Sequence, residues 1–465
     1  MTGLRLTLVH PRFRDPTGDI PLGLATLAAW VRRDLPEVEV ALHDGTFSPG
    51  ISAAAAFFDR NRPDVVGIGT GTLALPDAIA VARCAHARGA RVVLGGPHPT
   101  LCADDLLRRH PEVDAVVVGE GEESLVDLLR FGFDAATPPP GVVGRDGRGH
   151  PVHGPPRAPL SDLDRLPHPA WDLLDMPRYL ATWGRLDARW PGLPGAAVSA
   201  SRGCPFHCSF CQPALSRLFG PGLRLRSPGH VVAEVVALRS RHGVRGIWFT
   251  DDTFTVHHDW VASFCDAWRA SGLDLPWGCT SRADLLDPEI LDRMVDAGLA
   301  SLGLGLESAV DRVRNGIYEK GVSLERIEAA VHHAHARGVH TFLFVMLGAP
   351  GERLAEMATT LRTASRLPAD DASISLCVPL PGTALRARLE DAGVHLSDDA
   401  AHYDYYRAQP FAGTLPPWAL RGLQRWGWAR FYAVPRRWSA LLRRVAHPAG
   451  RRGLARHLAR LAPRG

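Results

Sequence analysis

Lysine is almost absent from this chain. Of the 53 basic side chains in 465 residues only Lys320 is a lysine, and all the others are arginines. A bias of this kind usually records codon composition and excludes no function. An ammonium is a flexible point charge whereas a guanidinium is a planar fork, so Lys320 marks a position where the pressure that replaced lysine elsewhere did not act. Chance explains a single case of this kind equally well.

Long apolar runs are also missing. No stretch of 18 or more apolar residues occurs, so the sequence predicts no membrane-spanning helix. Eight cysteines in a chain of this length do not indicate a disulfide scaffold. With no recognisable signal peptide, we expect a protein of the reducing cytoplasm. The length leaves room for two or three domains.

Acidic residues are absent from the C-terminal end. Residues 421–465 hold twelve arginines and no aspartate or glutamate, so the net charge of +4 for the whole chain leaves −8 on the first 420 residues. Such a tail can contact an anionic membrane surface, nucleic acid or the acidic body of the protein itself. The plain alternative is a basic helix that packs on the domain with its arginines in solvent.

Three cysteines are clustered where the others are scattered. Cys204, Cys208 and Cys211 follow a strand-like stretch at Ala196–Ala200 with C-x3-C-x2-C spacing. Soft thiolates select iron–sulfur clusters or zinc, and three of them can hold three corners of a 4Fe-4S cube with the fourth iron left open. A zinc site completed by His207 and a chance grouping are the alternatives. Zinc sites usually draw ligands as two separated pairs, and no second pair appears.

The segment Ser201–Cys211 resembles the signature of radical S-adenosylmethionine (SAM) enzymes, in particular the subgroup with an N-terminal cobalamin-binding domain. The resemblance extends over roughly residues 1–385. It implies three cofactors, a 4Fe-4S cluster, SAM and cobalamin, and an electron donor such as flavodoxin or ferredoxin. In that family SAM chelates the open iron, and one electron splits it into methionine and a 5′-deoxyadenosyl radical.

Residues 1–133 show the pattern of an α/β fold with a doubly wound, Rossmann-like parallel sheet. Apolar strand-like runs alternate with helical patterns such as 22–33 and 77–88. Right-handed crossovers then place a ligand crevice at the carboxyl ends of the strands. The predicted strands are 4–9, 38–42, 65–68, 91–94 and 115–118.

Glycines, prolines and threonines follow these strands, and such residues allow close approach of a flat ligand. By spacing alone they fit any nucleotide site or simple tight turns. The turns Pro21–Leu24, Gly95–Thr100 and Val118–Glu122 resemble those of the cobalamin-binding domain. The resemblance therefore implies these cobalamin-binding residues: Pro11, Leu22, Gly23, Thr70, Thr72, Gly95, Gly96, Pro97, His98, Gly119, Glu120 and Glu122.

The D-x-H-x-x-G motif, with which many B12 proteins supply a histidine to cobalt, is absent. We therefore expect cobalamin to bind without that imidazole and with its own base displaced. His10 and His98 lie on loops of the correct edge. A loop histidine near a ligand more often serves hydrogen bonding or packing than cobalt ligation.

The proline- and glycine-rich residues 134–195 predict a linker without regular structure that wraps the domain junction, with Trp171 buried as an anchor. From 196 to 385 strands and helices alternate again in about six βα units. This number fits the partial, TIM-like (β/α)6 barrel of the radical SAM family. Barrel sites lie at the carboxyl ends of the strands.

Residues at those strand ends match the family's SAM-binding positions. The resemblance assigns them to the adenine, amino, carboxylate and ribose groups of SAM: Phe210, Asp251, Asp252, Arg282, Glu307, Gly348 and Pro350. The simpler interpretations are a hydrophobic cover of the cluster for Phe210 and a helix N-cap for Asp252. Cys377 ends a barrel strand, where the two interpretations are a thiol that donates a hydrogen atom and a small buried hydrophobe. No side chain is expected to be catalytic, because the cofactors carry the chemistry.

Residues 386–465 predict a mostly helical, arginine- and aromatic-rich region that caps the barrel and helps to shape the substrate pocket. Helical spacing favours core packing over nucleic-acid binding for its aromatics, and we expect no nucleic-acid partner. Peripheral membrane contact by the basic end stays open. The aromatic and apolar positions concerned are Tyr403, Tyr405, Tyr406, Trp418, Trp426, Trp428, Phe431, Tyr432, Trp438, Leu441, Leu442, Val445, Leu454, Leu458 and Leu461.

The resulting hypothesis is an enzyme that methylates an unactivated carbon, or a phosphinate phosphorus, of a small molecule such as a natural-product precursor. With the same cofactors, ring closure, rearrangement or oxidation without methyl transfer is the alternative, and product mass separates the two. A non-catalytic iron–sulfur or corrinoid carrier is the hypothesis of another class. Such a carrier would not require Asp251, Arg282 and Glu307 beside the cluster motif, so the presence of these residues argues against it.

Overall fold

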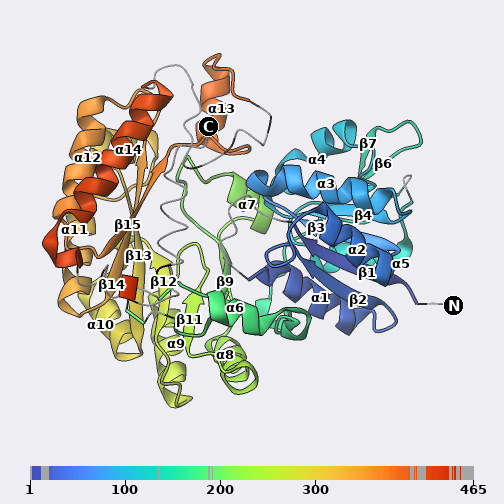
Figure 1. Cartoon of the computed structure of the whole chain (residues 1–465), viewed down its shortest axis with the longest axis horizontal. Coiled ribbons are helices and arrows are strands. Elements are labelled where there is room, and N and C mark those ends of the chain that lie inside the picture. The colour runs from blue at the N-terminus through green and yellow to red at the C-terminus, as the bar shows by residue number, and fades with distance from the viewer. Residues whose placement is uncertain are drawn as a thin grey trace.

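The computed structural model describes residues 3–11, 20–134, 137–186, 189–190, 192–397 and 415–438, together with the isolated positions 399, 403, 405, 442, 445, 446 and 451. Two sheet-based domains lie side by side (Figure 1), the N-terminal one in blue and the second in yellow and orange. Within this part of the chain no helix has the length and apolar character that crossing a membrane requires.

The N-terminal domain is built on a parallel sheet with the strand order β2-β1-β3-β4-β5. Its core strands are short apolar runs that are buried on both faces, as covered parallel strands require. Because the order reverses at β1, the carboxyl ends of β1 and β3 border a crevice. The elements are β1 (Arg5–His10), α1 (Leu22–Asp34), β2 (Glu39–Asp44), α2 (Ile51–Asn61), β3 (Val65–Gly69), α3 (Leu75–His86), β4 (Arg91–Gly95), α4 (Pro97–Arg109), β5 (Ala115–Val117) and α5 (Glu122–Phe131).

Part of the expected linker belongs to this sheet. Strands β6 (Val142–Arg145) and β7 (Pro151–His153) continue it in antiparallel pairing beside β5. The expectation of no regular structure was wrong for these residues, because Val142 and Val143 bury their side chains against the sheet. Pro151 is tolerated because β7 is the edge strand. Further along, α6 (Met176–Thr182) forms and Trp171 is buried, as predicted.

The second domain is a curled sheet of six parallel strands in the sequential order β15-β14-β13-β12-β11-β8. Helices α10, α11 and α12 cover it on the side away from the N-terminal domain (Figure 1). The predicted α/β fold with a six-stranded partial barrel is confirmed. Its elements are β8 (Gly195–Val198), α8 (Pro228–His242), β11 (Gly246–Phe249), α9 (His258–Ala270), β12 (Trp277–Ser281), α10 (Pro288–Asp296), β13 (Leu299–Glu307), α11 (Leu324–Ala336), β14 (His340–Leu347), α12 (Leu354–Arg366) and β15 (Asp371–Leu376).

The C-terminal region contributes α13 (Ala384–Asp391) and α14 (Pro417–Tyr432). Instead of capping the barrel mouth, α14 joins the outer layer beside α12 (Figure 1). The Gln424 side chain donates to the carbonyl of Ile374 in β15, and Gly427 leaves room for Leu361 and Ile374. Tyr406, Leu441, Leu454, Leu458 and Leu461 lie outside the described residues.

Candidate cofactor site

The three clustered cysteines lie on one loop at the carboxyl rim of the barrel. The loop follows β9 (Ser201–Gly203), which pairs with β10 (Leu223–Leu225). All three are free, half-buried thiols. Thr253 Oγ1, after β11, lies 3.8 Å from Cys204 Sγ, and Arg282 Nη1, after β12, donates to Cys208 Sγ at 3.6 Å. The thiols therefore face the rim of the barrel.

Burial favours the protonated form of Cys208 and Cys211 by raising the pKa of both thiols. It raises the pKa of Cys211 to about 12, and the nearby charges of Asp252, Cys204 and Cys208 act in the same direction. Burial also raises the pKa of Cys208, although Lys320 and Arg282 oppose it. Three soft sulfur donors on one loop fit an iron–sulfur cluster, whose positive charge would favour their thiolate forms.

The zinc alternative has no geometric support. No three His, Cys, Asp or Glu side chains of the described residues converge on one ion position, and His207 is exposed. A cube spreads its ligands over several irons, so the three thiols need not meet at one point. The donor set therefore fits a cluster better than a single ion.

Arg282 braces the cysteine loop. Its guanidinium stacks on Phe206 at 3.7 Å, pairs with Asp284 at 3.0 Å and donates to the carbonyl of Lys320 at 2.7 Å. Together with its contact to Cys208, these bonds hold it within the loop. The structure thus places Arg282 beside the thiols, with most of its donors already engaged.

Glu307 and Lys320 form a buried ion pair at the end of β13, with Nζ 2.9 Å from Oε1. Glu307 has a left-handed backbone with φ of 54°. The register between β13 and β14 shifts at this point, which changes the direction of its side chain. A Cβ at Gly305 would collide with both charged groups, so any larger residue there would require the ion pair to shift. The sole lysine of the chain therefore lies within the candidate site.

The two adjacent acids after β11 lie in different environments. Asp251 is buried, accepts hydrogen bonds from the Ala200 N–H and the Ser201 hydroxyl, and has its pKa raised by burial to about 6. It ties the end of β11 to the loop after β8. Asp252 is exposed and lines a cavity of about 390 Å³ between the domains. The N-cap of α9 is His257, so the N-cap interpretation of Asp252 was wrong.

Phe210 and Cys377 lie in a small apolar cluster under the cysteine loop. The Phe210 ring meets Tyr318 edge-on, with centroids 5.5 Å apart. Cys377 is buried beside Val313 and Ala349 in the same cluster. This environment agrees with the interpretation of Cys377 as a small buried hydrophobe.

The turn after β14 contains the predicted residues Gly348 and Pro350. Gly348 has a φ of 84° and packs against Leu420 of α14, and its N–H donates to the buried Glu352 at 2.7 Å. Pro350 is half-buried in the same turn. Glu352 therefore holds the shape of the backbone that is expected to surround adenine.

A cavity of about 370 Å³ lies at the carboxyl ends of β1, β3, β4 and β5. A Cβ on Gly23 or Gly71, which both line it, would meet no protein atom within 4 Å, so these glycines keep space open rather than serve packing. This cradle fits a large flat ligand such as a corrin. The predicted cobalamin residues that line it are Gly23, Thr70, Gly95, Gly96, Pro97, Gly119, Glu120 and Glu122.

The cavity between the domains continues this one toward the barrel. Gly23, Pro97 and Arg202 line both cavities, and the second also contains Leu22 and reaches Asp252. Residues of the predicted cobalamin and SAM sites thus border one continuous series of cavities.

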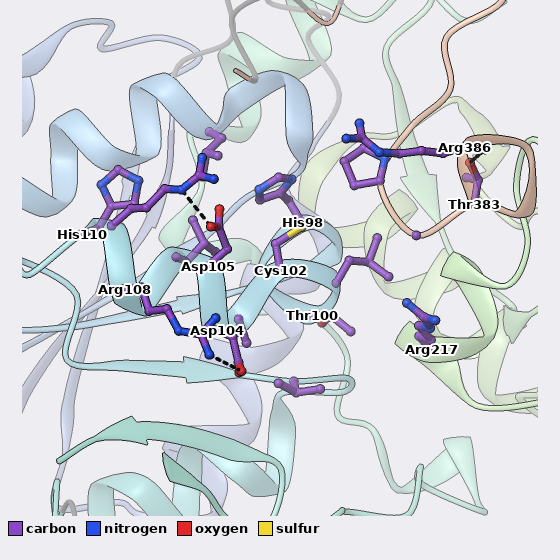
Figure 2. Close-up of a pocket in the computed structure, with 18 of the residues that line it drawn as sticks. His98, Thr100, Cys102, Asp104, Asp105, Arg108, His110, Arg217, Thr383 and Arg386 are labelled. Carbon is purple, nitrogen blue, oxygen red and sulfur yellow. Dashed lines mark hydrogen bonds and ion pairs between the residues drawn. The ribbon is translucent and has the colours of Figure 1, made fainter. Parts of the chain in front are cut away.

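Three predicted cobalamin residues line neither of these two cavities. Pro11 is buried after β1, and Thr72 is hydrogen-bonded to His98, with Oγ1 and Nδ1 3.1 Å apart. His98 borders another cavity of about 1160 Å³. In Figure 2 its side chain lies between Asp105 of α4 and Arg386 of α13. Burial, followed by the charge of Arg386, lowers the pKa of His98 to about 4. His10 does line the smaller cavity.

Glu120 and Glu122 join the two domains. Arg202 pairs with Glu120 at 3.0 Å and with Glu122 at 2.5 Å, and Arg224 pairs with Glu120 at 2.7 Å. Burial alone would raise the pKa of Glu120, but the bond from Arg224 and the charge of Arg202 lower it. The sequence analysis missed both arginines, since only their acidic partners stand in a recognisable turn.

Comparisons with known proteins agree with this geometry. Residues 19–129 match the B12 binding domain and residues 198–364 the Radical SAM superfamily. An uncharacterized methyltransferase of Pyrococcus horikoshii is 34% identical over 78% of this chain and 77% of its own length. Cytidylyl-2-hydroxyethylphosphonate methyltransferase of Streptomyces wedmorensis is 28% identical, over 73% of this chain and 66% of its own.

A solved structure shows the same fold. The radical S-adenosylmethionine methyltransferase TsrM from Kitasatospora setae, with cobalamin and a 4Fe-4S cluster bound, superposes with a TM-score of 0.69 at 19% identity. The match covers 84% of this chain and 75% of that one.

Proposed function

This chain belongs to the cobalamin-dependent branch of the radical SAM superfamily, and from that premise we propose that it transfers a methyl group to an unactivated carbon, or to a phosphinate phosphorus, of a small-molecule substrate. The resemblance inferred from the cysteine segment is confirmed, and the protein is an enzyme that uses a 4Fe-4S cluster, SAM and cobalamin. The observation that carries the proposal is the series of cavities that leads from the glycine-lined cradle to Asp252, after barrel strand β11.

We propose that Cys204, Cys208 and Cys211 ligate the cluster, because they are free thiols on one loop at the barrel rim. When bound, the cluster and SAM supply a 5′-deoxyadenosyl radical and the corrinoid supplies the methyl group. The chain itself contributes binding, orientation and exclusion of water. Arg282 holds the loop in place through Phe206 and Cys208.

For SAM we propose that Asp252 meets the ammonium, because its carboxylate is exposed in the cavity whereas that of Asp251 is already engaged. Glu307 with Lys320 offers polar contacts at the end of β13. Phe210, Gly348 and Pro350 would border the adenine. Asp251 would support the position of Asp252 and would not itself contact SAM.

For cobalamin we propose that the cradle residues contact the corrin while Glu120 and Glu122 hold the domains together beside it. Leu22 borders the adjoining cavity. Pro11, Thr72 and His98 would act indirectly, through the shape of the strand ends. His98 faces another cavity, which disfavours it as a ligand to cobalt.

The substrate class rests on the names of relatives and on this site. One relative is named as a methyltransferase of a phosphonate substrate. The chain would divide into a cobalamin domain (1–133), a connecting segment (134–195), a SAM barrel (196–385) and a C-terminal region (386–465). A flavodoxin or ferredoxin would deliver electrons, and an oxygen-labile cluster with free cysteines suits the cytoplasm.

The test is anaerobic reconstitution with iron, sulfide and hydroxocobalamin, followed by product analysis with candidate substrates. Methyl transfer predicts a product heavier by one methylene, together with S-adenosylhomocysteine and 5′-deoxyadenosine. A product without added carbon would favour the ring-forming, rearranging or oxidising alternative. Absence of SAM cleavage by the reduced protein would favour a carrier and contradict the proposal.

A further inference from the structure

Helix α14 exposes large aromatic side chains on the outside of the molecule. Trp418 and Trp426 of α14 are 73% and 41% exposed, and Trp438, which follows the helix, is 51% exposed. Leu442 and Val445 continue this exposure beyond the helix. The opposite face of α14 is fully used, since Leu420, Gln424, Gly427, Trp428 and Phe431 pack on the barrel. Packing of the helix therefore does not account for the exposed tryptophans.

Arginines alternate with these aromatic side chains. Arg421, Arg425 and Arg430 are exposed on the same face of α14 as Trp418 and Trp426. Arg430 lies over the Trp426 ring at 5.6 Å. Arg362 and Arg366 of the neighbouring α12 add two further exposed cations.

This face is free of acidic groups along its own chain. Residues 415–465 contain no aspartate or glutamate, and twelve arginines lie between 421 and 465. No carboxylate of this segment itself therefore neutralises the exposed arginines of α14. Because the preceding part of the chain is net negative, the positive charge is concentrated in the C-terminal part of the sequence.

We propose that the exposed side of α14, together with Trp438, Leu442 and Val445, forms a docking surface for an anionic membrane, termed here the Trp/Arg face. Tryptophan favours the headgroup level, where its ring has one apolar and one hydrated side, and arginine pairs with lipid phosphates. Each basic side chain near an anionic surface strengthens binding about fivefold. Three exposed aromatics with five exposed arginines give the two signals, apolar and electrostatic, that stable peripheral binding needs.

The same composition could attract nucleic acid, but the shape of the face favours lipid. Single strands bind in grooves where bases stack on aromatic rings. Helix α14 instead lies in the outer helical layer (Figure 1), and none of the cavities described above contains a residue from it. A projecting helix with aromatic and basic side chains fits a flat, deformable surface.

The inference does not depend on the reaction, and its test needs no cofactor turnover. The full chain is incubated with vesicles of pure phosphatidylcholine or of equal parts phosphatidylcholine and phosphatidylglycerol, and bound protein is measured by sedimentation. We expect binding only to the anionic vesicles, with loss at high salt. Hydrogen exchange in the presence of these vesicles should slow across residues 415–438.

Two sets of variants distinguish the contribution of this face to vesicle binding from that of net charge alone. Trp418→Ala with Trp426→Ala, and Arg421→Gln with Arg425→Gln and Arg430→Gln, should each lower vesicle binding at least tenfold. The matched control Arg130→Gln with Arg241→Gln and Arg326→Gln removes the same charge from exposed positions elsewhere and should leave it unchanged. All these side chains are exposed, so the fold is expected to persist, and far-ultraviolet circular dichroism checks this.

Equal losses for the control and test sets would overturn the proposal, as would unchanged binding in the tryptophan variant. Tight binding of a single-stranded oligonucleotide without binding to anionic vesicles would assign the face to nucleic acid instead.

Discussion

At the residue scale, the buried pair of Glu307 and Lys320 gives a reason for the single lysine of the chain. The ammonium reaches Glu307 past Gly305, where even a methyl group would collide. A guanidinium is wider and planar, so arginine would not fit the same space. The choice of lysine at this position is therefore steric as well as electrostatic.

Replacement of Lys320 by Met should destabilise the protein strongly, because it leaves the Glu307 carboxylate buried without its cation. We expect the free energy of unfolding to fall by about 3 kcal/mol or more. Chemical denaturation of the cofactor-free chain measures this. The double variant Lys320→Met with Glu307→Gln should recover most of the loss, and equal stability of the single variant and the wild type would contradict the account.

Glu352 predicts a pH dependence of stability. Burial raises its pKa to about 7 from an ordinary value of 4.5. The folded state therefore binds more protons than the unfolded state between these values, and the contribution of this group falls as pH rises from 4.5 to 7. Glu352→Gln keeps an acceptor for the Gly348 N–H but cannot ionise.

The stability gained by Glu352→Gln over wild type should therefore grow from near zero at pH 4.5 to about 3 kcal/mol above pH 7. Denaturant unfolding across this range measures it, with the exposed Glu289→Gln as the control that should follow the wild type. If the difference in unfolding free energy between Glu352→Gln and the wild type did not change with pH, ionisation of Glu352 would not destabilise the fold as predicted.

Sequence alone could identify the cysteine loop, because its three cysteines lie within eight residues. It could not separate Asp251 from Asp252, since their difference depends on hydrogen bonds from Ala200 and Ser201, some fifty residues earlier in the chain. Nor could it show that His98 faces another cavity, because that depends on α13.

At the scale of elements, the strands predicted from apolar runs lie within two residues of those observed, since buried parallel strands are continuous apolar segments. Strands β6 and β7 were missed because β6 is ordered by its pairing with β5, which no local pattern encodes, and β7 pairs in turn with β6. Helix α14 was predicted as a helix but placed at the barrel mouth, because an amphipathic pattern does not say which surface it covers.

The turns after the strands of the first sheet should tolerate a side chain in the absence of a ligand. Gly71→Val places a β-branched residue on an extended backbone with no protein atom nearby. We expect near-normal thermal stability but at least tenfold weaker cobalamin binding, measured by spectroscopic titration. The matched change Gly147→Val, in the turn between β6 and β7, should leave binding intact, and equal binding by both variants would contradict the assignment of this cavity.

At the scale of the whole molecule, the buried ion pairs of Arg202 and Arg224 with Glu120 and Glu122 link the two domains beside the cofactor cavities. Neither domain's local pattern could reveal this link, because each partner is unremarkable within its own domain. Since both proposed cofactor sites border the junction, its rigidity fixes the distance between them.

Arg202→Ala should loosen this junction, because Glu122 then loses its buried partner. We expect a loss of about 3 kcal/mol in unfolding free energy and a calorimetric transition that separates into two. Adding Glu122→Gln should restore part of the cooperativity. A single unshifted transition in Arg202→Ala would show that the pairs do not couple the domains.

The most direct test of the central claim is the reductive cleavage of SAM by anaerobically reconstituted protein. The account predicts a 4Fe-4S absorption band and formation of 5′-deoxyadenosine by the wild type. The variant with Cys204, Cys208 and Cys211 changed to alanine should show neither, although its fold persists by circular dichroism. Absence of the cluster from the wild type, or cleavage that survives in the triple variant, would contradict the assignment of these thiols.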